Sequence, residues 1–373
     1  MKTCKMFMVF SFFLISIHGK ALPDEPFQEL YPVKVEDVVK YINNEGKIVL
    51  ETEYPYATRF SCGLAIIEGD SGKYGVIDTE GDVVVFPQYG WIRSFTDNMA
   101  AFRKEEFAAE NTHWGYLNDA GKVISRQWYD RCFDFSDGRG LVVKDGKWGF
   151  VSPTGDTIIP IKYDFARPFS GKMAVVRVKG KYGYVDVNGK YVIEPQYDDA
   201  ASFSERLASV ASKNRYGYID KTGKVVIDYR YEDARSFSEG LAMVVEKGAI
   251  KYINADGLQV ISVAQYANAF PFQGGVARVV KLDNGISKYD YIDKNGGRIN
   301  ETSYDMAYDM SEGLAVIKVK QKYGYMDING AIVIPAIYDG ATPFVGDAAK
   351  VIIQGEEITI NKKGLVIWKG NNK

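Results

Sequence analysis

The sequence repeats itself with a period of about 34 residues, and this feature constrains the fold more than any other. An aromatic residue followed by glycine marks the regular copies, which are Tyr74-Gly75, Trp114-Gly115, Trp148-Gly149, Tyr182-Gly183, Tyr216-Gly217 and Tyr323-Gly324. Ile250-Lys251 and Tyr289-Asp290 are degenerate copies. We therefore expect a tandem array of one structural unit, in which each unit gains stability from its neighbours.

The spacing inside each copy is nearly fixed. In one copy the turn glycine is Gly189, a tyrosine follows eight residues later at Tyr197, and a large apolar residue follows after six more at Phe203. The same register holds from Gly46 onwards, with Tyr266 one residue late. A chain that was merely rich in tyrosine would not keep this register. The pattern predicts a repeat domain over residues 39–370, with about nine repeats and a partial last one.

Each copy reads as strands and turns, and helical periodicity is absent. Residues 182–186 predict a strand, and Asp186 to Gly189 fit a type I turn closed by a left-handed glycine. Residues 190–194 predict the return strand, which Pro195 should end because proline cannot donate to the ladder. A third strand is expected at 207–210, after an irregular arm. Gly183 in mid-strand suggests that another backbone or ring passes close by.

The predicted fold is therefore all-β, made of tandem β-meander repeats. Two architectures fit this reading. A propeller-like ring, in which sheets pack radially, is favoured over an open β-solenoid, in which they stack along an axis.

Two copies are longer than the rest. The spacing is 40 residues between Tyr74 and Trp114 and 39 between Ile250 and Tyr289. Both insertions precede the aromatic-glycine pair, near 103–111 and 281–287, and insertions gather where the backbone faces solvent. These stretches are predicted as surface loops. Their candidate binding residues are Arg103, Lys104, Glu105, Glu106, Phe107, Asp283 and Asn284.

The N-terminus has the layout of a secretory signal peptide. Lys2 and Lys5 precede a short apolar run, and small residues follow it at Gly19 and Ala21. The pattern predicts a signal peptide over 1–21, a lead segment over 22–38, and a secreted, periplasmic or cell-surface location. An uncleaved anchor or a buried segment is the alternative. No later segment is apolar enough to predict a transmembrane span in the mature chain. Cys62 and Cys132 are interpreted as small buried hydrophobes.

Catalytic and cofactor chemistry is sparse. His113 is the one histidine beyond the signal peptide, and the string from Gly69 to Gly72 fits a turn better than a protease serine motif. We predict no catalytic residues, no cofactor and no metal site, since soft ligands are few and the Asp-x-Asn-Gly turns lack the acids of a calcium loop. A net charge of −2 without a basic stripe argues against a nucleic-acid partner.

Recurring polar and aromatic residues leave two further questions. Acids follow the fixed tyrosine at Asp198, Asp199, Glu232 and Asp233, and paired carboxylates could hydrolyse glycans. Recurrence argues against this, because an active site is one place. The aromatic residues could bind sugars or peptides, but a core role between sheets is favoured; these residues are Tyr182, Tyr184, Tyr197 and Phe203.

The segments KWGFVSPTGDTIIPIKYDFARPF (147–169) and KYGYVDVNGKYVIEPQYDDAASFSERLA (181–208) resemble the bacterial WG-repeat family. The resemblance covers nearly the whole chain after the predicted signal peptide. It implies a β-rich module that mediates interactions, and no catalytic residue set is attached to the repeat. The expected function is non-catalytic binding or scaffolding at the cell envelope or exterior, with a protein or glycan partner. The alternative is a propeller-type hydrolase of cell-surface glycans or peptides.

Overall fold

The computed structural model describes residues 29–104 and 113–370. In these residues the chain forms short antiparallel β-sheets joined in sequence, and no helix is present that could span a membrane. The chain divides into two compact units between Trp128 and Tyr129. The predicted all-β class of tandem, propeller-like repeats is confirmed, since successive copies of the repeat form successive sheets.

The first unit has three sheets in its described residues. Their strands are β1 (Tyr31–Val35), β2 (Val38–Ile42) and β3 (Ile48–Glu51); β4 (Tyr56–Ala57), β5 (Leu64–Glu68), β6 (Tyr74–Asp78) and β7 (Val83–Tyr89); and β8 (Trp91–Ile92), β9 (Met99–Arg103) and β10 (Trp114–Asn118). Strand β1 pairs with β2 along its whole length. The predicted lead segment, 22–38, therefore supplies a strand of the first sheet, and residues before 29 lie outside the described residues.

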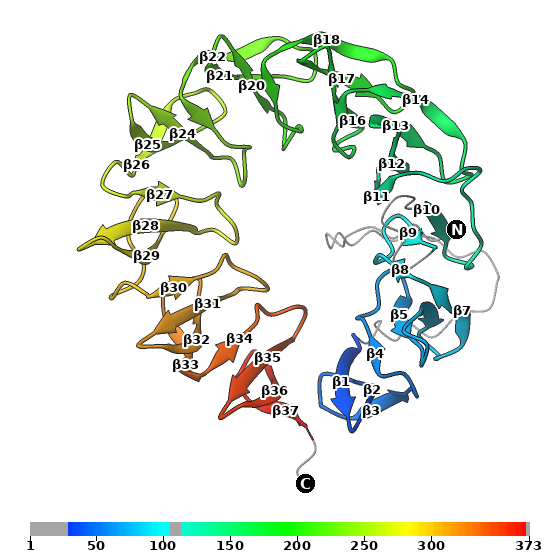
Figure 1. Ribbon diagram of the computed structural model, residues 1–373. Coiled ribbons are helices and arrows are strands. Elements are labelled where there is room, and N and C mark those ends of the chain that lie inside the picture. Colours follow the sequence, from blue (N-terminus) through cyan, green and yellow to red (C-terminus); the bar gives the residue numbers. More distant parts are fainter. Residues whose placement is uncertain (1–28, 105–112, 371–373) are drawn as a thin grey trace, which may run out of the picture. The chain divides into compact units, whose positions relative to one another are not determined.

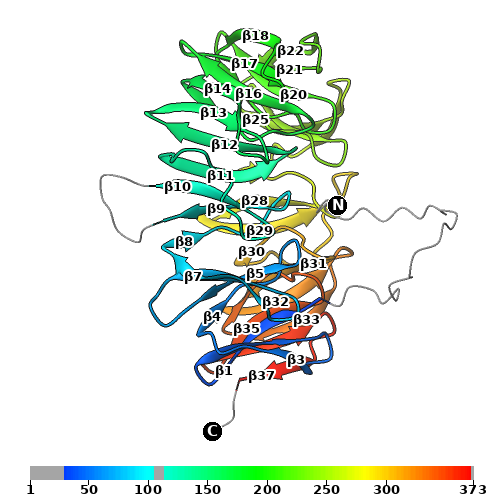
Figure 2. The same cartoon turned by 90° about the vertical axis from the view of Figure 1, so that its right-hand side faces the viewer.

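The second unit has seven sheets, which follow one another in chain order (Figure 1). The first three contain β11 (Arg131–Ser136), β12 (Arg139–Lys144), β13 (Lys147–Val151) and β14 (Thr157–Tyr163); β15 (Phe165–Ala166), β16 (Met173–Val178), β17 (Lys181–Asp186) and β18 (Tyr191–Tyr197); and β19 (Asp199–Ala200), β20 (Ala208–Ser212), β21 (Arg215–Ile219) and β22 (Val225–Tyr231). Figure 2 shows β11, β12, β13 and β14 side by side in this order.

The other four sheets of this unit include one with three strands. They contain β23 (Asp233–Ala234), β24 (Ala242–Glu246), β25 (Ala249–Ile253) and β26 (Gln259–Ser262); β27 (Asn268–Ala269), β28 (Ala277–Asp283) and β29 (Ile286–Ile292); β30 (Met306–Ala307), β31 (Leu314–Val319), β32 (Lys322–Asp327) and β33 (Ile332–Tyr338); and β34 (Gly340–Ala341), β35 (Ala348–Ile353), β36 (Glu356–Asn361) and β37 (Val366–Lys369).

A regular sheet differs from the predicted three-strand meander in two ways. The arm is not wholly irregular, because its first residues form a two-residue strand such as β15, which pairs with β16. The strand predicted at 207–210 pairs with the next aromatic-glycine strand, β21, and not with the preceding return strand. A sheet therefore begins after the fixed tyrosine of one repeat and ends at the fixed tyrosine of the next. The sequence shows how long the repeat is, but it does not show at which residue of the repeat a sheet begins.

The prediction that Pro195 ends the return strand is wrong, since β18 continues to Tyr197. Strand β18 is the edge of its sheet, where a residue without an N–H can be accommodated. Tyr182 pairs with Tyr197 but Tyr184 pairs with Ile193, so β18 has extra residues opposite Gly183. This bulge carries the β18 backbone over the glycine.

The prediction of a close approach at the mid-strand glycine is confirmed. A Cβ added to Gly183 would lie 2.6 Å from the carbonyl oxygen of Ile193 and 2.7 Å from the nitrogen of Pro195. Gly75, Gly149, Gly217 and Gly324 are covered by backbone in the same way. At Gly115 the covering atoms belong to the rings of Phe102 and Trp128. Only a residue without a side chain fits beneath these atoms.

The core lies between successive sheets of each unit. In one cluster, Tyr184 and Tyr197 pack with Phe203 and with the apolar face of the following sheet. All three side chains are buried, which confirms the predicted core role for them. Tyr182 is half-buried and packs at the margin of the same cluster. Cys132 is buried in β11 as predicted, whereas Cys62 is half-buried in a left-handed backbone conformation (φ 55°).

Two recurring side-chain bonds tie successive sheets together. The serine that follows the arm phenylalanine donates to the carbonyl oxygen of the next arm phenylalanine, as Ser170 does to Phe203 at 3.0 Å and Ser204 does to Phe237 at 2.7 Å. The tyrosine after the mid-strand glycine donates to the next arm, as Tyr184 does to the carbonyl oxygen of Ala201 at 2.8 Å. These repeated hydrogen bonds give the recurring serines and tyrosines a structural role.

The longer copy at 281–287 is not the irregular loop that was predicted. Strands β28 and β29 each have seven residues and pair up to Asp283 and Ile286, with a two-residue turn at Asn284 and Gly285. Both turn residues have positive φ, at 51° and 81°, which matches the twist of a hairpin. The insertion therefore lengthens a hairpin. In the other longer copy, residues 105–112 lie outside the described residues.

Candidate interaction surface

An acid that recurs after the fixed tyrosine holds neighbouring sheets together. Asp164 accepts hydrogen bonds from Lys147 Nζ at 2.7 Å and from the backbone amide of Lys179, in the next sheet, at 2.7 Å. The bond from Lys147, followed by that from the Lys179 amide, lowers the pKa of Asp164 below its usual value. Equivalent residues make the same pair of contacts; they are Asp198, Glu232, Asp305 and Asp339. We name this arrangement the carboxylate clamp.

The four acids that could have formed a hydrolytic pair have partners that repeat with the fold. Asp198 and Glu232 belong to carboxylate clamps. Asp199 accepts a hydrogen bond from the Tyr216 hydroxyl at 2.9 Å, and Asp233 forms an ion pair with Arg235 at 3.2 Å. The hydrolase alternative gains no support from these residues, because each acid is engaged by a contact of its own repeat position.

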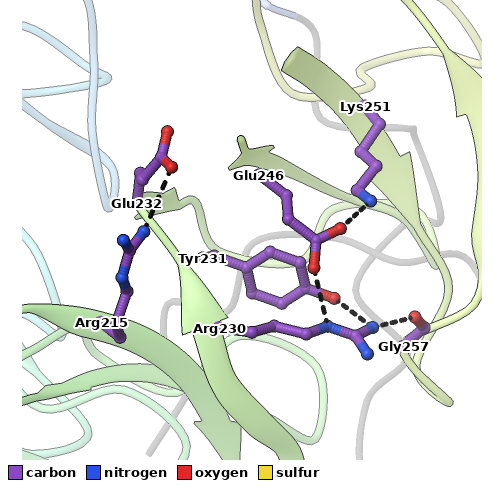
Figure 3. A network of polar contacts seen from close by, with 7 residues as sticks. All are labelled: Arg215, Arg230, Tyr231, Glu232, Glu246, Lys251 and Gly257. Atoms are coloured by element: carbon purple, nitrogen blue, oxygen red, sulfur yellow. Dashed lines mark hydrogen bonds and ion pairs between the residues drawn. The ribbon is translucent and has the colours of Figure 1, made fainter. Parts of the chain in front are cut away.

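Lys251 replaces the mid-strand glycine in the first degenerate copy. Its pairing with Ser262 is in register, so the neighbouring strand has no bulge at this place. The Lys251 ammonium contacts Glu246, which also lies 3.5 Å from Arg230 (Figure 3). Arg230 in turn donates to the Tyr231 hydroxyl at 2.7 Å and to the Gly257 carbonyl oxygen at 2.8 Å. The Lys251 side chain is thus part of a polar network that joins β22, β24 and β25.

Asp290 replaces the glycine in the second degenerate copy and is 1% exposed. Its carboxylate lies 3.1 Å from Arg298 and 3.8 Å from Lys281, and it accepts a hydrogen bond from Asn300 at 3.0 Å. Asn300 also accepts a bond from the Tyr291 amide at 2.7 Å. These contacts satisfy a sheet edge that lacks a full fourth strand. A buried acid with these partners stabilises the sheet, because its charge is compensated and its oxygens are hydrogen-bonded.

A row of aromatic rings crosses two sheets of the second unit, and we name it the aromatic strip. It consists of Phe133, Trp148, Phe165 and Tyr182, with successive centroid distances of 5.3, 5.1 and 6.3 Å. All four side chains are half-buried, so the strip keeps part of its apolar surface in contact with solvent. Half-exposed aromatic rings of this kind are typical of recognition surfaces.

A second aromatic group, the aromatic triad, lies in the first unit at equivalent repeat positions. Tyr74 contacts Tyr56 at 6.2 Å and Trp91 at 5.1 Å, in edge-to-face geometry. Tyr56 and Trp91 are each 43% exposed, which is unusual for large aromatic side chains. The sequence signal for both groups was available, because Tyr56, Trp91 and Phe165 stand two residues after the fixed tyrosine. The other copies have no aromatic residue there; they have Arg131, Asp199, Asp233, Asn268, Met306 and Gly340.

The structure places the predicted site residues as follows. The aromatic residues of the aromatic-glycine pairs contribute Tyr74, Trp148 and Tyr182 to the two aromatic groups, and their glycines are structural. Lys104 lies 5.7 Å from the centre of the Trp128 ring, just after the end of β9 at Arg103. Asp283 and Asn284 are exposed at the tip of the β28–β29 hairpin. Glu105, Glu106 and Phe107 lie outside the described residues.

Other candidate chemistry is explained locally. The string from Gly69 to Gly72 is the turn between β5 and β6, closed by the Gly72 amide donating to the Gly69 carbonyl oxygen at 2.9 Å, as predicted. The described residues contain no group of three His, Cys, Asp or Glu side chains that could hold a metal ion.

The sequence matches the model of the WG containing repeat eight times, at residues 41–72, 74–106, 114–148, 148–182, 182–214, 216–248, 291–323 and 323–355. The protein belongs to the WG-repeat family. The one long gap in these matches, 249–290, contains both Lys251 and Asp290, where the WG-repeat protein loses its mid-strand glycine. The resemblance inferred from the aromatic-glycine pairs is thus confirmed.

One solved structure supports the fold of this WG-repeat protein, and two others are more distantly similar. A structure described as the eukaryotic initiation factor matches with a TM-score of 0.54 at 11% identity, covering 82% of this chain and 95% of the other. BamB from Moraxella catarrhalis matches with a TM-score of 0.36 at 12% identity, over 72% and 92% of the two chains. PorZ, a surface component of the type-IX secretion system of Porphyromonas gingivalis, gives 0.28 at 11% identity, over 93% and 59%. No curated protein matches the sequence.

Proposed function

We propose that this WG-repeat protein is a non-catalytic binding protein that works at the bacterial cell envelope or exterior. The observation that carries the proposal is the pair of aromatic groups, because their rings keep exposed surface that the packing between sheets does not require. The recurring polar residues are engaged in holding sheets together, which leaves the aromatic positions as the variable part of the repeat. The proposed location rests on the signal-peptide pattern of residues 1–21.

Binding through the aromatic triad can be tested with the full chain. Beads that carry the wild-type protein would be incubated with separate protein and polysaccharide fractions of an envelope extract, and the retained material measured. The double variant Tyr56→Ala, Trp91→Ala should retain at most a tenth of the wild-type amount, because it loses the central rings of the surface. Val49→Ala is the control, since Val49 is similarly exposed at 44% and lies outside the triad.

Two results would contradict the proposal. Equal retention by the wild type and the double variant would show that the triad is not a binding surface, provided that the matching aromatic-strip variant, Trp148→Ala, also retains the wild-type amount. Release of new reducing ends or peptide fragments from a fraction by the wild-type protein would contradict a non-catalytic role. Fusion of residues 1–28 to a reporter tests the location, and a reporter that stays inside the cell would contradict it.

A further inference from the structure

Two arginine side chains flank Phe165 in the aromatic strip. The guanidinium carbon of Arg167 lies 5.6 Å from the centre of the Phe165 ring, and that of Arg177 lies 5.8 Å from the same ring. Arg177 is also 5.7 Å from the centre of the Tyr182 ring. Phe165, Arg177 and Tyr182 are direct cross-strand partners in one sheet. Two positive charges therefore converge on one half-buried ring.

These charges lack the carboxylate partners that other arginines have, although Arg177 Nη1 donates to the Tyr182 hydroxyl at 3.5 Å. Arg235 occupies the position of Arg167 two repeats later, and there it pairs with Asp233 at 3.2 Å. The residue at the Asp233 position in the earlier sheet is Phe165. Among the described residues, neither Arg167 nor Arg177 forms an ion pair, and Arg177 Nε is buried without a hydrogen-bond partner. The charge of Arg177 contributes to the lowered pKa of Asp164, but the carboxylate oxygens of Asp164 accept their hydrogen bonds from Lys147 Nζ and the Lys179 amide.

We propose that Arg167 and Arg177, together with Phe165 and Tyr182, bind a carboxylate carried by an acidic sugar of a glycan. This inference rests on the proposed binding function and names its ligand class. Guanidinium groups bind carboxylates with strong, charge-assisted hydrogen bonds, and the exposed side chain of Arg167 can present its guanidinium to a ligand. The neighbouring rings of Trp148 and Phe165 supply apolar surface for a sugar ring.

An acidic peptide fits the site less well. A peptide usually binds a sheet by adding a strand to an open edge, with pockets for alternate side chains. The edge at this site is β15, which has only two residues, and such short edges are poor templates for strand pairing. The rings of the strip pack against one another in a continuous row, which suits a flat sugar chain.

The substitution Phe165→Asp tests the proposal without removing either arginine. It introduces the acid that the next two sheets carry at this position, Asp199 and Asp233, so the sheet should still fold. The new carboxylate should pair with Arg167, as Asp233 does with Arg235. The probes are polygalacturonate oligosaccharides, their neutral methyl esters and poly-glutamate, with binding to the full chain measured by calorimetry at fixed ionic strength. Arg235→Gln is the matched control, and thermal melting checks folding.

The wild type should bind polygalacturonate at least tenfold more tightly than either the methyl ester or poly-glutamate. Phe165→Asp and Arg177→Gln should each weaken that binding about tenfold, as loss of a charge-assisted contact requires, and Arg235→Gln should not change it. Unchanged binding by Phe165→Asp overturns the site. Equal or tighter binding of poly-glutamate overturns the glycan assignment in favour of acidic peptides. Failure of all three probes, with retention of envelope material still dependent on Trp148, overturns this inference but leaves the proposed function in place.

Discussion

The sheets β15–β18 and β27–β29 are formed by different copies of the same repeat within one unit, but only the first keeps all four strands. In β15–β18 the backbone of β18 crosses over Gly183, a carboxylate clamp from Asp164 holds the β16–β17 turn, and Ser170 bonds to the next arm. In β27–β29 the glycine is Asp290, the clamp acid is Ala267, and the serine is Gln273. The fourth strand is reduced to isolated bridges, and the hairpin is extended.

The difference does not follow from the glycine alone, because β23–β26 also lacks it, at Lys251, but keeps the clamp acid Glu232 and all four strands. In β27–β29 the side chain of Asn300 accepts the hydrogen bond from the Tyr291 amide, where a regular sheet has its fourth strand. Without a clamp acid, the turn between the second and third strands is no longer held at a fixed length. The sheet β8–β10 shows the converse: it keeps Gly115 but has Gly90 at the clamp position, a longer connection and three strands, and Ser125 Oγ accepts the bond from the Tyr116 amide.

The largest expected effect compares the cores beside the two sheets. Phe203→Ala should destabilise the protein by about 3–5 kcal/mol, because it leaves a cavity in the cluster that contains Tyr184 and Tyr197. Met310 occupies the same repeat position in the core beside β27–β29, so Phe203→Met should cost less than about 2 kcal/mol. Thermal and urea unfolding would measure both. A melt of Phe203→Ala that matches the wild type would contradict the core assignment.

The next effect concerns the buried acid that replaces the glycine. Asp290→Ala should cost about 3 kcal/mol, since it removes the partner of Arg298 and Asn300 inside the sheet. Asp283→Ala, an exposed acid on the same hairpin, should change the free energy of unfolding by less than about 0.5 kcal/mol. Urea unfolding of both variants provides the comparison. Equal stability of the two would mean that the network around Asp290 is not what replaces the fourth strand.

A third experiment tests the glycine itself. Gly183→Ala should cost about 2 kcal/mol, because its Cβ would meet the β18 backbone at 2.6 Å. Lys251→Ala, at the same repeat position without a crossing strand, should cost less than about 1 kcal/mol. Unfolding in urea would separate the two. If Gly183→Ala proved as mild as Lys251→Ala, close approach would not be the reason for the recurring glycine.

Much of this organisation could be predicted from the sequence, because it depends on residues at fixed spacing. The period, the strands of the aromatic-glycine hairpin, the close approach at Gly183 and the core role of Phe203 all follow from local pattern. The phase of the sheets could be predicted only in part: the short turn at Lys213-Asn214 leads from Leu207 to Val210 into the next aromatic-glycine strand, but a meander would also pair them with the return strand before them. The continuation of β18 through Pro195 depends on its being an edge strand, which is a property of the sheet.

The candidate site was predicted less well, for a physical reason. The aromatic strip is assembled from two sheets, and its exposure depends on how Trp148 and Phe165 pack across them. The pattern showed that an aromatic residue recurs at the position of Trp148, but it did not show which face of the ring stays exposed to solvent. The extended hairpin was predicted as a loop because length alone does not distinguish them. Its turn residues, Asn284-Gly285, are nevertheless a sequence signal for a hairpin.

The smallest expected effect is the pH dependence of the carboxylate clamp. Lys181, and then the amide of Lys213, lower the pKa of Asp198 below its ordinary value of 3.8. The clamp therefore contributes stability above pH 3.8, and this contribution is lost as the pH falls through the lower pKa of the folded state. Asp198→Asn should lower the melting temperature slightly at pH 7, and the difference from wild type should disappear below pH 3.8.

Ala267→Asp is the control variant for this experiment. It places an acid at the missing clamp position of the extended hairpin, whose turn lies beyond reach, so it should not raise the melting temperature at pH 7. If Ala267→Asp raised the melting temperature by as much as Asp198→Asn lowers it, an acid at the clamp position would stabilise the sheet whatever the length of the hairpin.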